Sequence, residues 1–67
     1  GIEALSDREL EIFRLIGNGC GSAEIAGQLH VSQNTVGTHK ENIRRKLGAK
    51  NSTELLQQAV RWVLESR

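Results

Sequence analysis

Apolar residues recur at every third or fourth position along most of the chain, and glycine-rich or polar stretches separate the periodic segments. In the first segment, three apolar residues fall on one side of a helix: Leu10, Phe13 and Ile16. Ser6 and Glu9 have the spacing of a capping box, which starts a helix. Three glycines within residues 17–21 favour an end to it. The pattern therefore predicts a helix over residues 7–16.

Two more helices follow, separated by a short turn. Ser22 is the predicted N-cap of a short helix over residues 23–29, and Ser32 is the predicted N-cap of a longer helix over residues 33–47. A short helix, a tight turn and a longer helix with a basic end are typical of a helix-turn-helix, here at about residues 22–41.

A fourth helix is predicted over residues 52–66. Gly48 takes the position at which a helix often ends, and Asn51 with Glu54 resembles a second capping box. One apolar stripe of this helix can close the core: Leu55, Ala59 and Trp62. Further apolar residues broaden that face: Leu56, Val60, Val63 and Leu64. A domain this small cannot easily cover so broad a face, so these four residues either pack under the first helix or form a dimer interface.

The predicted fold class is all-α, a four-helix bundle in a single domain over residues 1–67. Leu, Glu, Lys, Arg and Ala dominate the composition and proline is absent, which favours helices over sheets. The chain opens abruptly at Gly1, so we expect it to be a piece excised from a longer protein. Cys20 is the only cysteine and no apolar run approaches membrane length, so the sequence predicts a cytoplasmic protein without membrane contact.

Charge is divided unevenly along the chain although its total is only +1. Residues 1–30 carry five acidic and two basic side chains, a net charge of −3. Residues 31–50 carry five basic side chains and one acidic one, a net charge of +4. This segregation indicates one face suited to a polyanion such as nucleic acid.

The third predicted helix has two distinct faces when it is unrolled at 100° per residue. The core-facing line consists of Val36, Ile43 and Leu47. The opposite face carries Asn34, Thr38, Glu41 and Arg45, with Gly37 and Arg44 beside them. A helix in the major groove presents such a face to base edges. Lys46 and Lys50 suit phosphates, although a solvated charged face explains the same cations.

Several spaced segments resemble the C-terminal DNA-binding domain of the LuxR/FixJ/NarL family of bacterial transcriptional regulators. They are LSDRELEI at 5–12, GNGCGSAEIA at 17–26, VSQNTVGTH at 31–39, NIRRKLG at 42–48 and NSTEL at 51–55. The resemblance implies a scaffold helix near residues 22–29 and a recognition helix near residues 33–47. It also implies sequence-specific binding to double-stranded DNA for transcription regulation, as a homodimer on a pseudo-palindromic site.

The resemblance and the helix faces together assign the candidate site residues. Those expected to face bases are Asn34, Gly37, Thr38, Glu41 and Arg45. Those expected to meet the DNA backbone are Ser32, Gln33, Thr35, His39, Lys40, Arg44, Lys46 and Lys50. His39 also borders the core, where a packed histidine is the commoner role.

The chain departs from the family pattern within this site. The family usually has lysine or arginine at the position of Gly37 and often a polar or basic residue at that of Glu41. Ser52 stands where many relatives have arginine. Glycine removes a side-chain contact but lets the backbone approach the groove, and glutamate repels phosphates but accepts from the N4 amine of cytosine.

The pattern favours a binding domain over an enzyme, and it predicts no cofactor and no metal. The sequence has no Cys/His metal-binding spacing and no nucleophile beside a base. The glycines at 17–21 lack the strand and lysine of a phosphate-binding loop, so a plain turn is expected there. The alternative function is a protein-interaction or dimerisation module that has lost base readout. RNA polymerase is a further candidate partner.

Overall fold

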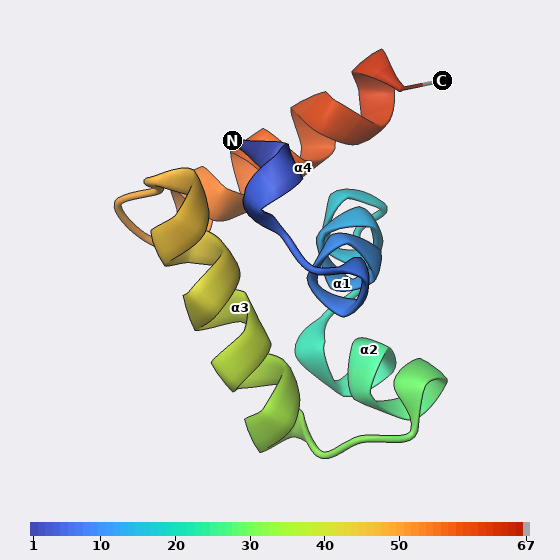
Figure 1. Cartoon of the computed structure of the whole chain (residues 1–67). Coiled ribbons are helices and arrows are strands. Elements are labelled where there is room, and N and C mark those ends of the chain that lie inside the picture. The colour runs from blue at the N-terminus through green and yellow to red at the C-terminus, as the bar shows by residue number, and fades with distance from the viewer. Residues whose placement is uncertain (67) are drawn as a thin grey trace.

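Four α-helices and one short 3-10 helix form the computed structural model, which describes residues 1–66 (Figure 1). Their bounds are Ile2–Ala4 for η1, Asp7–Gly17 for α1, Ser22–Leu29 for α2, Gln33–Leu47 for α3 and Ser52–Glu65 for α4. No strand occurs among the described residues, and the predicted all-α fold class is confirmed. Each predicted helix is present, with bounds that differ from the predicted ones by at most one residue.

The caps of α1 and α3 are formed as predicted. The Ser6 hydroxyl accepts from the Glu9 amide at 3.2 Å, and the Glu9 carboxylate accepts from the Ser6 amide at 2.9 Å. The Ser32 hydroxyl accepts from the Thr35 amide at 3.1 Å. Gly48 closes α3 in the left-handed region, with φ of 69°. Local sequence signals therefore define both ends of the longer helix of the helix-turn-helix.

Two other cap predictions were wrong in detail. Gly21, not Ser22, is the N-cap of α2, because its carbonyl accepts the first helical bond, from the Ile25 amide at 2.9 Å. The Ser22 hydroxyl accepts from the Lys40 ammonium at 3.1 Å. At the start of α4 the Asn51 side chain accepts from the Glu54 amide, as expected. The return bond differs, because the Glu54 carboxylate accepts from the Lys50 amide rather than from that of Asn51. The 3-10 turn η1 was not predicted.

A single core joins all four α-helices. α1 contacts both α3 and α4, while α2 packs against α3 (Figure 1). The buried apolar residues are Ile12, Phe13, Ile16, Ile25, Ala26, Val36, Ile43, Ala49, Leu55 and Ala59. Trp62 is half-buried and its ring lies 5.6 Å from that of Phe13, at a tilt of 45°. The predicted core stripe of the fourth helix is therefore confirmed.

Gly17 permits the close approach of α1 to α4. It is the last residue of α1, and a Cβ at this position would overlap the Ala59 backbone carbonyl and lie 2.5 Å from a methyl carbon of Val63. Gly19 follows with φ of 90°, a conformation that favours glycine. The glycine segment thus connects two helices, as the turn prediction stated, and its first glycine also serves packing.

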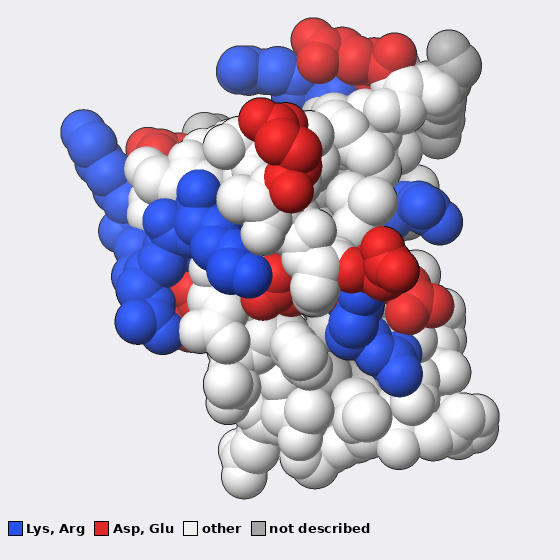
Figure 2. All heavy atoms as spheres, in the orientation of Figure 1, with Lys and Arg blue, Asp and Glu red and all other residues white. Residues whose placement is uncertain are grey.

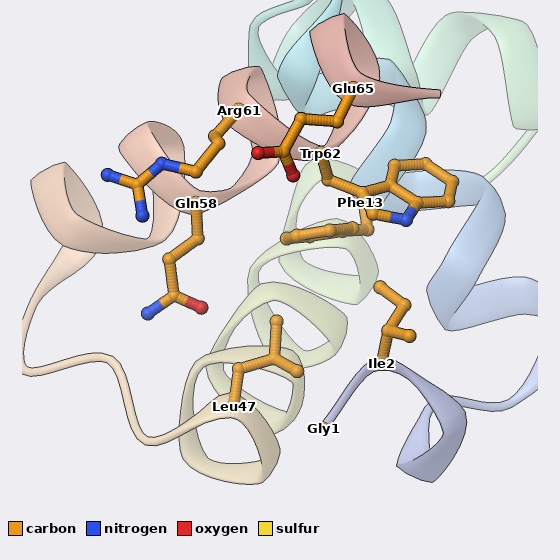
Figure 3. A pocket seen from close by; sticks show the side chains of 8 residues that line it. All are labelled: Gly1, Ile2, Phe13, Leu47, Gln58, Arg61, Trp62 and Glu65. Atoms are coloured by element: carbon orange, nitrogen blue, oxygen red, sulfur yellow. The ribbon is translucent and has the colours of Figure 1, made fainter. Parts of the chain in front are cut away.

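An open cleft of about 350 Å³ lies between the start of the chain and α4 (Figure 3). Ile2, Phe13 and Leu47 give it an apolar floor, and Gln58, Arg61 and Glu65 border it. None of the residues that line it is one of those predicted to contact DNA. Among the described residues, no helix is long and apolar enough to cross a membrane, and no group of His, Cys, Asp or Glu side chains is arranged to hold a metal ion.

Candidate nucleic-acid interface

α3 presents one buried face and one exposed face. Val36 and Ile43 are fully buried and Leu47 is half-buried, so this line fixes the rotation of the helix on α1 and α2. The outer face of α3 is formed by Asn34, Gly37, Thr38, Glu41 and Arg45, all of which are exposed. The structure therefore brings these five predicted residues together on one surface.

The outer face of α3 is slightly hollow at its centre. Its five residues line a shallow depression together with Gln33 and Asn42. The Thr38 hydroxyl donates to the Asn34 backbone carbonyl at 3.1 Å, so it is satisfied within the helix. Gly37 contributes no side chain, and nothing lies within 4 Å of where its Cβ would stand. Close packing within the domain therefore does not explain the glycine at this position.

Gly37→Ala is expected to raise the free energy of unfolding by about 1 kcal/mol. Alanine is a stronger helix former than glycine, and its methyl group would meet open space here. In a domain of this size that gain corresponds to a thermal midpoint higher by roughly 5 °C, measurable by circular dichroism. A midpoint equal to or below that of the wild type would contradict the exposed helical setting.

Glu41 and Arg44 form a two-pronged ion pair beside the outer face. Arg44 Nε donates to Glu41 Oε2 at 3.0 Å, and Arg44 Nη2 donates to Oε1 at 2.5 Å. The hydrogen bond from Arg44 lowers the pKa of Glu41, and the same hydrogen bond raises the pKa of Arg44. Arg44 Nη1 also donates to the Ala49 carbonyl at 2.7 Å, which ties the pair to the turn after α3.

Lys46 joins α3 to α1 through a buried carboxylate. Its Nζ lies 2.7 Å from Glu9 Oε1, the same oxygen that accepts from the Ser6 amide. Glu9 is only 5 % exposed. The hydrogen bond from Lys46 and the one from the Ser6 backbone lower the pKa of this carboxyl group, against the opposing effect of burial. The sequence indicated only the capping role of Glu9, because the partners of this ion pair lie 37 residues apart and no local pattern joins them.

Three other cations near α3 have no carboxylate partner among the described residues. Lys40 donates to the Ser22 hydroxyl, and Arg45 donates to the Asn42 side-chain carbonyl at 2.9 Å. The Lys50 ammonium forms no hydrogen bond or ion pair with the described residues. Figure 2 shows Lys and Arg gathered over the C-terminal half of α3, while its N-terminal end is uncharged. Positive charge thus borders a neutral polar surface.

The remaining predicted backbone residues lie in the N-terminal half of α3 and at its N-cap. Ser32, Gln33 and Thr35 are exposed in its first turn, where the Ser32 and Thr35 hydroxyls lie 3.0 Å apart. His39 is half-buried, which agrees with its predicted place at the edge of the core. Ser32, Gln33 and Thr35 lie at the end of the helix that usually enters the groove in helix-turn-helix proteins, whereas His39 lies in the middle of α3.

Part of the broad apolar face of α4 packs against α1, and part of it stays exposed as a candidate dimer interface. Val63 is half-buried and packs toward Gly17 at the end of α1. Leu56, Val60 and Leu64 are 43 %, 37 % and 59 % exposed, and we call these three residues the α4 stripe. Polar residues flank the stripe on α4: Gln57, Arg61 and Glu65. The three exposed residues stay a predicted dimer contact, whereas Val63 contributes to the fold.

Comparison with known proteins agrees with this architecture. Residues 3–59 match the luxR family of bacterial regulatory proteins. The oxygen regulatory protein NreC of Staphylococcus aureus, from strains JH9 and USA300 alike, is 51 % identical to this chain over 57 residues. That stretch covers 85 % of this chain and 26 % of NreC, so the chain spans about a quarter of the length of these relatives. The chain belongs to the luxR family of bacterial regulatory proteins, a family of helix-turn-helix transcription regulators that bind DNA.

Proposed function

We propose that this domain binds double-stranded DNA sequence-specifically, with α3 as the recognition helix in the major groove. The observation that carries the proposal is the exposed polar face of α3, which includes Arg45 and lies opposite the buried Val36 and Ile43. Lys and Arg gather over the C-terminal half of the same helix (Figure 2). A polar face supplies hydrogen-bond partners for base edges, and cations beside it suit phosphates. The proposed role is regulation of transcription.

The proposed contacts are of two kinds, those to base edges and those to the DNA backbone. Asn34, Thr38, Glu41 and Arg45 would face bases, and Gly37 would let the helix backbone approach them closely. The backbone contacts would come from Ser32, Gln33, Thr35, His39, Lys40 and Lys50. Arg44 and Lys46 are engaged with carboxylates inside the domain, so we expect their phosphate contacts to contribute less.

We further propose that two copies of the chain bind together through the α4 stripe. Leu56, Val60 and Leu64 expose apolar surface that the fold itself leaves uncovered. Twofold dimers bind half-sites about one helical turn apart, so the DNA site is expected to be pseudo-palindromic.

Binding to random-sequence duplex DNA should weaken steeply as salt rises. If Lys40 and Lys50 each neutralise a phosphate, the logarithm of affinity should fall with the logarithm of salt at a slope of about −1.8 per chain. That slope corresponds to roughly a twelvefold loss of affinity between 50 and 200 mM salt. Fluorescence anisotropy of a labelled duplex measures it directly.

Matched variants separate phosphate contact from general charge loss. Lys50→Gln should reduce the slope by about one, whereas Arg14→Gln removes an equal charge from the exposed side of α1 and should leave it unchanged. Absence of binding even at low salt would contradict DNA binding and favour a protein-interaction module.

A further inference from the structure

We propose that Glu41 reads a cytosine in the major groove and that Arg44 is the positioning residue that makes this reading possible. The inference rests on the proposed DNA-binding function and deepens it. It assigns Arg44 a role different from the phosphate contact that its position on the helix had indicated. The carboxylate is the base-contacting group, and the guanidinium acts through it.

Arg44 is arranged to hold a neighbour rather than to reach a base. Three of its five N–H donors are engaged, two on the Glu41 carboxylate and one on the Ala49 carbonyl. The Ala49 bond draws the guanidinium toward the turn between α3 and α4. Its side chain is accordingly half as exposed as that of Glu41, at 26 % against 50 %.

Glu41 keeps acceptor capacity on its open side. A carboxylate offers about four lone-pair sites, and the two bonds from Arg44 occupy one on each oxygen. The adjacent guanidinium offsets the negative charge that would otherwise repel phosphates, and the two-pronged geometry restricts the flexible side chain. Arg44 thus converts a residue unfavourable near DNA into a fixed, charge-compensated acceptor.

Cytosine is the base whose groove edge fits such an acceptor. An ionised carboxylate only accepts, and the pKa of Glu41 is lowered by Arg44, so the group stays ionised at neutral pH. Guanine and thymine present acceptors at this edge, and adenine places its N7 acceptor next to its amine. The cytosine N4 amine has no acceptor beside it on the same base.

Selection of bound duplexes from a random pool tests the assignment. Wild-type protein should enrich cytosine roughly tenfold at one position of each half-site. Arg44→Lys keeps the charge but loses the two-pronged geometry, so it should reduce this enrichment to about threefold and leave other positions unchanged. Glu41→Gln should shift the preference at the same position to adenine, which glutamine recognises in a bidentate manner.

Arg8→Lys is the matched control. Arg8 and Glu11 form an ion pair of the same i, i+3 spacing on α1, at 3.2 Å, away from α3. This variant should leave every selected position unchanged. If Arg44→Lys lowers affinity for all sequences alike and keeps the cytosine preference, Arg44 only supports the turn and the inference is overturned.

The outcomes also separate this inference from the proposed function. Selected sequences without a cytosine at any position would overturn the inference and leave DNA binding intact. Failure to retain any duplex at low salt would overturn both. Circular dichroism establishes that each variant is folded. If Arg44→Lys unfolds, the shift to adenine in Glu41→Gln still tests the reading by Glu41, and Arg44→Gln, which also lacks the two-pronged pair, should lose the cytosine preference if Arg44 positions Glu41.

Discussion

Gly17→Ala is expected to lower the free energy of unfolding by about 3 kcal/mol, whereas alanine at the other helical glycines meets open space. The new Cβ would overlap the Ala59 carbonyl and crowd Val63, so α1 and α4 would have to move apart. Backbone atoms of a helix cannot yield as a flexible side chain does. A domain of this length has only roughly 3–10 kcal/mol of stability, so a substantial fraction would unfold near physiological temperature.

The same substitution at two other helical glycines provides the control. Gly27 in α2 and Gly37 in α3 have nothing within 4 Å of a built Cβ, so alanine at either position should stabilise the domain. Urea unfolding followed by circular dichroism compares all three variants. If Gly17→Ala were as stable as Gly37→Ala, the close approach of α1 to α4 would be wrong.

Lys46→Ala is expected to lower the free energy of unfolding by about 2 kcal/mol. It removes the ammonium partner of a carboxylate that is almost wholly buried, leaving that carboxylate with its bond from the Ser6 amide. The loss is smaller than for a fully enclosed pair because the Lys46 side chain is 41 % exposed. Thermal unfolding at neutral pH measures the change, and Lys46→Arg, which keeps a cation, should recover most of it.

The effect of Lys46→Ala should diminish in acid. The folded-state pKa of Glu9 is lowered below its ordinary value of 4.5, so the unfolded chain binds its proton more readily. The stabilisation from the ionised group is therefore fully present above pH 4.5 and is lost as pH falls through the lowered folded-state pKa. An equal difference between wild type and variant at neutral pH and at pH 3 would contradict the role of the ion pair.

Weaker DNA binding by Lys46→Ala would not by itself identify a phosphate contact. The variant also loosens the attachment of α3 to α1, which lowers the population of folded domain. Stability and affinity therefore have to be measured on the same sample. Only a loss of affinity beyond the change in folded population would place Lys46 on the DNA backbone.

Features that depend on residues close together in the sequence were predicted correctly, whereas features that depend on distant residues were not. Ser32 and Gly48 bound α3 correctly because each cap bonds to groups within the same helix end. The N-cap assigned to Ser22 was wrong by one residue, because the Gly21 carbonyl accepts the first helical bond; the Ser22 hydroxyl instead meets Lys40, 18 residues away. No local pattern contains that information.

The candidate site shows the same limit. The exposed face of α3 could be predicted from helical periodicity, since Val36 and Ile43 fix the rotation of the helix. The pairing of Glu41 with Arg44 was also accessible, because residues three apart on a helix are neighbours. The contact between Gly17 and α4 could not be predicted, because a cluster of glycines indicates a turn whether or not one of them packs against another helix.

One carboxylate oxygen of Glu9 serves two parts of the molecule. It accepts from the amide that begins the cap of α1 and from the ammonium near the end of α3. Fraying of the N-terminus of α1 therefore weakens the contact between Glu9 and Lys46 on α3. A ligand that stabilises α3 should likewise reduce fraying at the N-terminus of α1. The two helix ends form a single opening unit, whose coupling acts equally in both directions.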